Sequence, residues 1–247
     1  MYTPSGRNLL RDSPADHIHH HGLMFAITAA GCDFWAEYPD QPQGKQELVE
    51  ITVDEQQAST TAELLWKNAD GQQVLHETRT ITALPHDQAT LLTWSSKLAK
   101  ADSQDLTLAG SHYFGLGMRF VPSMDNDGTF RFADDHEEPT VVRGDERVTK
   151  TAWAAYTATV DGGDPATAVL FAHPKNFRPM HAFTMGDNSP AFAFLSATLN
   201  LYRESHLWQG DQPLQLVWGI ALFDGNPSTE TITQLYQHWI STTSPQP

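Results

Sequence analysis

Short apolar runs recur along this chain, and turns rich in Gly, Pro, Asn and Asp separate them. In the run over 47–54, Val49, Ile51 and Val53 share one face, while the residues between them lie on the other. Alternation with a period of two is typical of a half-buried β-strand. The segment 68–71, Asn-Ala-Asp-Gly, is a hairpin-turn sequence. The pattern therefore predicts a meander of antiparallel strands.

The same rhythm continues to the end of the chain, so we predict an all-β fold, an antiparallel β-sandwich of the supersandwich or jelly-roll kind. A length of 247 residues fits one sandwich domain over 1–247. The abrupt start leaves open that an N-terminal strand or leader precedes Met1. Further strands are expected at 60–66, 74–83, 90–98, 106–121, 153–160, 168–172, 191–198 and 214–223.

One helix is predicted near the C-terminus, where it would cover the sandwich or one of its edges. Ser228 or Thr229 can cap its first turn, and Glu230 favours the positive end of the helix dipole. The apolar residues recur at the helical spacing i, i+3, i+4 and i+7, namely Ile232, Leu235, Tyr236 and Trp239.

The charge balance limits the partners of this protein. There are 30 acidic and 15 basic residues, and the formal net charge is −15. Nucleic acids and anionic membranes both attract clustered Lys and Arg, so neither is expected as a partner. The only cysteine, Cys32, excludes an intramolecular disulfide and any multi-cysteine metal site.

Several large classes of protein leave motifs that this sequence lacks. It contains no P-loop, dinucleotide fingerprint, G-x-S-x-G elbow or H-E-x-x-H motif, so no nucleotide cofactor is expected. No apolar run is long enough to cross a bilayer, and the first residues do not form a signal peptide. As given, the chain is expected to be soluble and cytoplasmic, or secreted or periplasmic if a leader lies upstream.

The strongest functional signal is the run Asp16-His17-Ile18-His19-His20-His21-Gly22. If the run is extended, His17, His19 and His21 share a face and His20 points away. If it turns, His17 converges with His20 or His21. Imidazole is a common metal ligand and a natural acid or base near neutral pH. A solvated histidine loop and incidental metal affinity are the simpler alternatives.

A metal site in this run would use His17, His19 and His20, with Asp16 orienting one imidazole through a hydrogen bond. An all-nitrogen site suits Zn, Ni, Fe or Cu better than Mg or Ca. The sequence thus points to a divalent transition metal as the one candidate cofactor.

A further pattern runs through nearly the whole chain, in the segments 2–6, 11–12, 16–23, 31–35, 115–120, 153–156, 172–176, 213–216 and 223–225. In these segments the sequence resembles a bacterial family labelled PmoA-like, or "methane oxygenase PmoA". The family usually has Pro where this chain has Ile18, an Arg-like residue at His21 and often His at Phe223. Methane oxygenation needs a membrane-embedded subunit, so that label is not read literally.

This resemblance implies a β-sandwich protein found among sugar-catabolic genes, with its function largely unassigned. We therefore expect a carbohydrate-active enzyme, a lyase, hydrolase or epimerase acting on a sugar or glycoside. A non-catalytic carbohydrate-binding protein and a soluble copper or iron oxidase acting on polysaccharide stay open, as does a homo-oligomer. The expected catalytic residues are His17, His20, His112 and His181, and the expected substrate-binding residues are Asp33, Trp35, Tyr113, Arg119, His173, Asn176 and Arg178.

Overall fold

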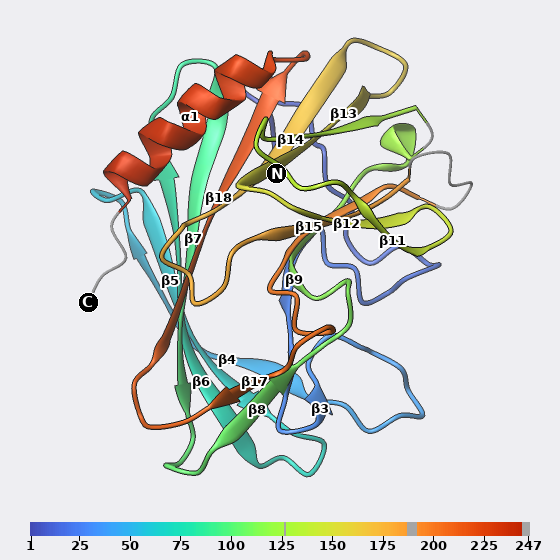
Figure 1. The fold of residues 1–247 in the computed structure, drawn as a ribbon. Helices are drawn as coiled ribbons and strands as arrows, with labels where there is room; N and C mark the ends of the chain where they lie inside the picture. Colours follow the sequence, from blue (N-terminus) through green and yellow to red (C-terminus); the bar gives the residue numbers. More distant parts are fainter. Residues whose placement is uncertain (126, 187–191, 244–247) are drawn as a thin grey trace.

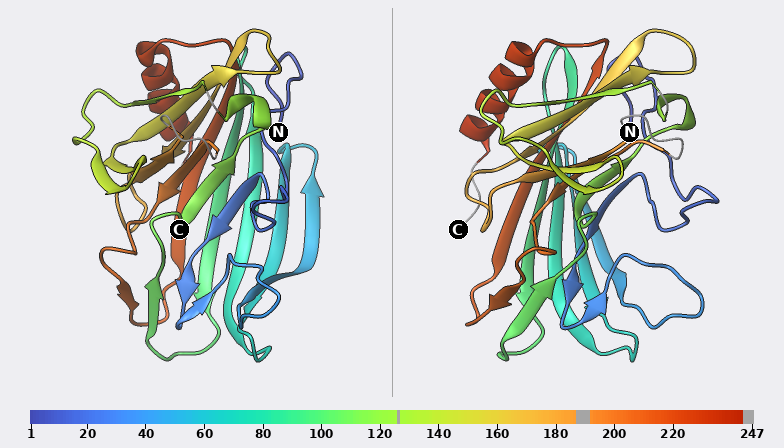
Figure 2. Two further views of the ribbon diagram at one scale, coloured as in Figure 1. Left: turned by 90° about the vertical axis from the view of Figure 1, so that its right-hand side faces the viewer. Right: turned by 45° about the vertical axis from the view of Figure 1, so that its right-hand side comes forward.

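A computed structural model describes residues 1–125, 127–186 and 192–243 of the chain (Figure 1). In this part of the chain the strands form three sheets, and a single α-helix follows the last strand. The two large sheets face each other as a sandwich (Figure 2). The predicted antiparallel β-sandwich with a C-terminal helix is confirmed.

The larger sheet holds the predicted meander. Hairpins join the successive strands at 45–54, 59–67, 73–84 and 89–100, and the predicted turn at 68–71 closes one of them with a bond from Gly71 N to Asn68 O of 3.0 Å. The order of its eight strands is β10 (Thr129–Phe132), β13 (Trp153–Thr159), β14 (Pro165–Ala172), β18 (Leu214–Asp224), β7 (Ala89–Lys100), β6 (Gln73–Leu84), β5 (Ser59–Lys67) and β4 (Lys45–Asp54).

The two faces of the second sheet pack in two different apolar clusters. Leu116 and Leu195 point into the main core between the sheets, whereas Met24, Phe183 and Phe194 form a smaller apolar cluster on the opposite face. Its six strands, in order, are β1 (Leu23–Ala26), β9 (Gly115–Arg119), β16 (Phe194–Thr198), β15 (His181–Met185), β12 (Glu146–Lys150) and β11 (Thr140–Arg143).

Short strands make up the remaining sheet and the connections. A 3-10 turn at Pro122–Met124 follows β9. The four-stranded sheet has the order β17 (His206–Trp208), β8 (Leu106–Ala109), β2 (Thr28–Ala29) and β3 (Cys32–Asp33).

The helix α1 (Thr229–Thr242) covers the outer face of the eight-stranded sheet, as predicted (Figure 1). Ser228 caps it by accepting a hydrogen bond from the Thr231 backbone N–H at 3.0 Å. The four residues of the predicted stripe are all buried, and Trp239 also donates a bond to Thr93 Oγ1 at 2.9 Å. Burial of this stripe fixes the helix on the sheet.

Two details of the strand prediction are wrong. The segment 106–121 is not one long strand, because a turn at 111–114 divides it between β8 and β9, which lie in different sheets. Gly115 begins β9 with a φ of +134°, and a Cβ there would lie 2.2 Å from the carbonyl oxygen of Ala197. Only a glycine fits this close approach of the two backbones.

The second error concerns β4, which is not half buried. It ends the eight-stranded sheet, and its side chains are exposed on both faces apart from the partly exposed Gln46. The expected strand over 191–198 begins at Phe194, and its first residue, Ala191, lies outside the described residues.

Candidate active site

A folded-back loop immediately before β1 carries the histidine run. Asp12 and His21 form an antiparallel bridge at its base, and Ser13 N donates to His20 O at 2.8 Å. Two tight turns follow inside the loop, from His17 N to Pro14 O and from His20 N to His17 O. Of the two geometries considered for the sequence, the structure has the turn.

The turn brings three imidazoles together on one side of the loop. The ring centre of His20 lies 4.7 Å from that of His17 and 4.7 Å from that of His19. Trp35 stacks on His20 at 5.1 Å with 9° between the ring planes, and the ring of Phe194 in β16 lies 5.3 Å from His20 and 6.3 Å from Trp35. The cluster therefore rests on the aromatic outer face of the six-stranded sheet.

Burial keeps two of these histidines neutral. His19 is 6% exposed and His20 only 1%. Burial lowers the pKa of His19, and burial together with the neighbouring His19 lowers the pKa of His20 to about 2. The Nδ1 atoms of both rings are buried without a hydrogen-bond partner among the described residues. Such atoms are costly to bury and point to a ligand contact or to a functional role.

His17 differs from its neighbours because it reaches solvent and is oriented by a carboxylate. Its side chain is 36% exposed, and its Nδ1 lies 2.9 Å from Asp16 Oδ2. Asp16 is itself 3.4 Å from the guanidinium of Arg119, which is fully buried and also faces Asp125. The buried guanidinium of Arg119 thus positions the carboxylate of Asp16, which in turn orients His17.

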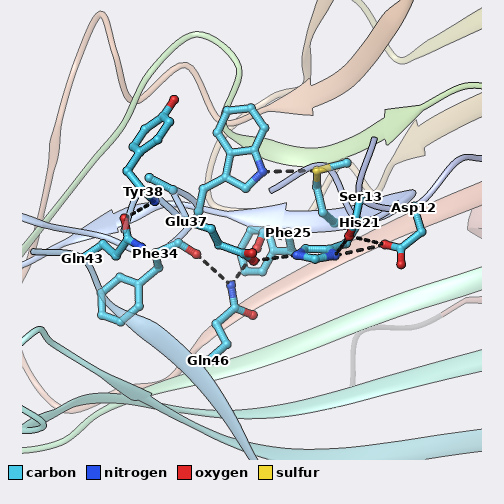
Figure 3. Close-up of polar contacts among 12 residues, drawn as sticks. Asp12, Ser13, His21, Phe25, Phe34, Glu37, Tyr38, Gln43 and Gln46 are labelled. Carbon is cyan, nitrogen blue, oxygen red and sulfur yellow. Dashed lines mark hydrogen bonds and ion pairs between the residues drawn. The ribbon is translucent and has the colours of Figure 1, made fainter. Parts of the chain in front are cut away.

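His21 leaves the cluster and joins two acidic residues instead (Figure 3). Its Nδ1 lies 3.0 Å from Asp12 Oδ1, and its Nε2 lies 2.6 Å from Glu37 Oε1. Burial lowers the pKa of His21, but the bonds to Glu37 and Asp12 outweigh it, so the pKa is raised. His21 therefore connects the histidine loop to the segment after β3 through its two carboxylate partners.

Trp35 connects the histidine cluster to a cavity of about 600 Å³. Asp33 holds the turn that presents Trp35, since its Oδ1 accepts bonds from Trp35 N at 2.7 Å and Ala36 N at 3.1 Å. The indole N–H of Trp35 points at Met24 Sδ, 3.2 Å away. Gln46 donates to the backbone oxygens of Phe25 and Phe34 nearby (Figure 3). Cavities of this size accept small organic ligands.

A second polar group continues the aromatic face beyond Trp35. Tyr113 lies 5.9 Å from Trp35, ring centre to ring centre, and donates a hydrogen bond to Glu146 Oε1 at 2.6 Å. Glu146 also receives His112 Nε2 at 3.1 Å and Arg143 at 2.6 Å. Burial raises the pKa of Glu146, but its bonds to Arg143 and Tyr113 outweigh this and hold the pKa low.

The structure thus brings together His17, His19, His20, Trp35, Tyr113 and His112 in one continuous set of ring contacts, with Asp33 and Arg119 behind it. Among the described residues, no ring contact joins His173 or His181 to this set. Glu146, Phe192 and Phe194 belong to the face but were missed, because no motif around them marks them in the sequence.

His173, Asn176 and Arg178 lie on the connection between β14 and β15, with His173 beside α1, and His181 is the first residue of β15. His173 Nε2 is 3.1 Å from Thr243 O, and the carboxamide of Asn176 bonds both backbone groups of Val217. Arg178 donates to the carbonyl oxygens of Glu204 and Ser205, and His181 Nδ1 lies 3.2 Å from Pro179 O. Their polar atoms therefore bond mainly to backbone.

The metal site expected at His17, His19 and His20 stays a prediction. Within residues 1–125, 127–186 and 192–243, no three His, Cys, Asp or Glu side chains are arranged to hold an ion. His17 uses Nδ1 on Asp16, which leaves its Nε2 and the unpartnered Nδ1 atoms of His19 and His20 as nitrogen donors for an ion.

By its fold, the chain is an antiparallel β-sandwich similar at a distance to domains of carbohydrate-active proteins. It matches the galactosidase domain of the α-galactosidase–sucrose kinase AgaSK with a TM-score of 0.51 and 11% identity, over 89% of this chain and 32% of that one. A GH36 α-galactosidase, AgaA from Geobacillus stearothermophilus, matches with a TM-score of 0.47 and 14% identity, over 83% and 30%. A putative aldose 1-epimerase from Klebsiella pneumoniae matches at 0.46 and 10%, over 78% and 58%.

The chain spans about a third of the length of the galactosidases it matches. Its family is defined by sequence: residues 1–237 match the profile described as "Family of unknown function (DUF6807)", and the chain belongs to this family. That description carries no PmoA label. A search of the curated proteins finds no match. No helix in the described part of the chain is long and apolar enough to cross a bilayer.

Proposed function

We propose that this protein is a carbohydrate-active enzyme that transfers protons on a sugar or glycoside, with the Asp16–His17 pair as its general base. The observation that carries the proposal is the half-exposed imidazole of His17, fixed by a carboxylate at 2.9 Å beside a row of aromatic rings.

The pair has the properties that a base needs. A carboxylate at Nδ1 selects the tautomer with its proton on Nδ1, so Nε2 keeps a lone pair for the substrate. The negative charge of Asp16 then stabilises the imidazolium that forms, as it does in hydrolase triads. Arg119 keeps Asp16 ionised and in place. The neutral ring of His20 packs against the ring of His17 on its buried side.

Flat rings and a cavity support a carbohydrate as the ligand. A sugar offers apolar C–H faces to rings such as Trp35 and the 47% exposed Tyr38, both of which contact His19. The cavity beside Trp35 adds room for further sugar atoms. The fold likeness to a galactosidase domain and the resemblance to PmoA-like proteins agree with this class of ligand, although neither carries a reaction across.

Glu146 is the second group proposed to act on the substrate. Its carboxylate and the hydroxyl of Tyr113 lie along the same aromatic face as His17, and they offer hydrogen-bonding partners that can position a substrate at the other end. A base and a separate positioning group suit a lyase or an epimerase as well as a hydrolase.

A divalent transition metal stays a proposal of its own, and no step above depends on it. Elemental analysis of tag-free protein tests it directly. Metal that is retained at a stoichiometric level in the wild type and lost in His19→Ala and His20→Ala would support Zn, Ni, Fe or Cu at this cluster.

The proposed reaction is tested by incubating the protein with free aldoses, uronates and glycosides and following the anomeric and C2 protons by NMR in D₂O. We expect exchange or product with at least one sugar, lost in His17→Ala and kept in His238→Ala, which changes an exposed histidine on α1. Tight binding in calorimetry without turnover of any sugar would instead favour a non-catalytic carbohydrate-binding protein. Product that needs oxygen and a reductant would favour the oxidase.

A further inference from the structure

The edge strand β4 exposes an unusual amount of apolar surface. Leu48 is 55% exposed, Val49 60%, Ile51 58% and Val53 65%. Most of the other exposed large apolar side chains of the described residues stand singly on separate loops or strands. A row of four on one strand is the kind of patch that marks an interaction site.

The backbone of β4 is open as well. Among the described residues it pairs only with β5, so the N–H and C=O groups on its other side have no strand partner. The strand is ten residues long and forms the margin of the sheet in Figure 2, where it is light blue. At the opposite margin of the sheet, β10 has only four residues. Long, open, apolar edges pair readily with another strand.

A bulge in β4 determines which side chains share a face. The register with β5 shifts between Leu48, which is opposite Leu64, and Glu50, which is opposite Glu63. Ile51 is opposite Ala62, so Leu48 and Ile51 project from the same face of the sheet, on either side of the bulge at Val49.

This arrangement makes the strand complementary to itself. If two copies of β4 run antiparallel about a two-fold axis between Val49 and Glu50, Leu48 faces Ile51 of the second copy. The same axis places Lys45 of each copy opposite Asp54 of the other, so the interface contains two such pairs. Both members of each pair project from the same face, and no like charges lie directly opposite each other. Lys45 has no ion-pair partner within the described residues, so it is free to make this contact.

We propose that a second copy of this chain binds at β4, joining two eight-stranded sheets into one continuous sheet across an isologous interface. The interface buries the four aliphatic side chains and pairs the open edge. Lys45 and Gln46 also line the cavity beside Trp35, so the second copy lies next to the mouth of that cavity. The inference does not depend on the proposed reaction.

Sedimentation velocity over a protein concentration series up to about 100 µM tests the interface, since this range detects micromolar dissociation constants. We expect a concentration-dependent dimer in the wild type. Ile51→Lys should raise the dimer dissociation constant at least tenfold by placing two ammonium groups in the apolar centre. Val141→Lys, an equally exposed site on β11, is the matched control and should change nothing.

A charge exchange tests the register. Lys45→Glu should also weaken the dimer at least tenfold, and Lys45→Glu with Asp54→Lys should restore it to within about threefold of the wild type. Thermal unfolding of each variant shows that it is folded. A wild type that stays monomeric at every concentration, or a dimer that Ile51→Lys leaves intact, overturns the proposal. Failure of the double exchange to restore the dimer overturns the register.

Discussion

The loop at 12–21 and the connection at 173–181 both flank strands of the sandwich, and both are rich in histidine and charged residues. In the second region, His173, Asn176, Arg178 and His181 direct their polar atoms at backbone groups. In the first region, His19 and His20 bury their Nδ1 atoms without a partner, while His17 holds a carboxylate and reaches solvent. A satisfied polar side chain holds the fold together, whereas an unsatisfied buried one costs stability and indicates a role beyond the fold.

The largest expected effect is on turnover. Asp16→Asn keeps the size of the side chain but removes the charge that sets the His17 tautomer, so kcat for the sugar substrate should fall by about 10² to 10⁴. His181→Ala, in the other region, should stay within about twofold of the wild type. Steady-state kinetics on the substrate found by NMR measures both. An equal fall in kcat in both variants would show that the histidine loop is no more important for turnover than His181.

A large effect on stability is expected from the other region. Asn176→Leu leaves the buried N–H of Val217 unpaired and removes one of the two hydrogen bonds to its C=O, which keeps the bond from His173 N, so the free energy of unfolding should fall by about 1 to 3 kcal/mol. His20→Phe fills the same aromatic site without an unpaired nitrogen and should change it by less than about 1 kcal/mol in either direction. Urea denaturation compares the two. A greater loss in His20→Phe would show that His20 is structural.

The pH dependence of stability separates the regions further. The pKa of His20 is lowered to about 2 in the folded protein, while the unfolded chain takes up this proton near pH 6.5. The contribution of neutral His20 is therefore complete above pH 6.5 and is lost as the pH falls towards the folded pKa, at about 1.4 kcal/mol per pH unit. Between pH 6.5 and 5, the unfolding free energy of His20→Phe should therefore depend less steeply on pH than that of the wild type, because up to one proton fewer is taken up on unfolding. An unchanged pH dependence would mean that the folded protein binds the His20 proton as readily as the unfolded chain does.

The smallest effect is expected at Arg178. Its guanidinium donates to the carbonyl oxygens of Glu204 and Ser205, and its alanine variant should lose about 1 kcal/mol of unfolding free energy with turnover unchanged. If Arg178→Ala lost turnover but kept the unfolding free energy of the wild type, Arg178 would be a substrate-binding residue.

Much of the architecture was predictable because local periodicity reports which side of an element is buried. The stripe at Ile232, Leu235, Tyr236 and Trp239 predicted both the helix and its buried face. The same rule failed for β4, where Val49, Ile51 and Val53 alternate but remain exposed. Alternation shows that a strand has two faces, and only the position of the strand in its sheet decides whether either face is covered.

The amino-acid sequence by itself determined the class of fold, the C-terminal helix and the histidine run as the centre of interest, since each depends on residues close together in the chain. Only the tertiary structure decided that the run turns, that His21 leaves it for Asp12 and Glu37, and that Trp35, Tyr113 and Glu146 extend it. It also decided that His173 lies beside α1. These contacts join residues far apart in sequence, and strand order, which no local pattern encodes, sets which of them meet.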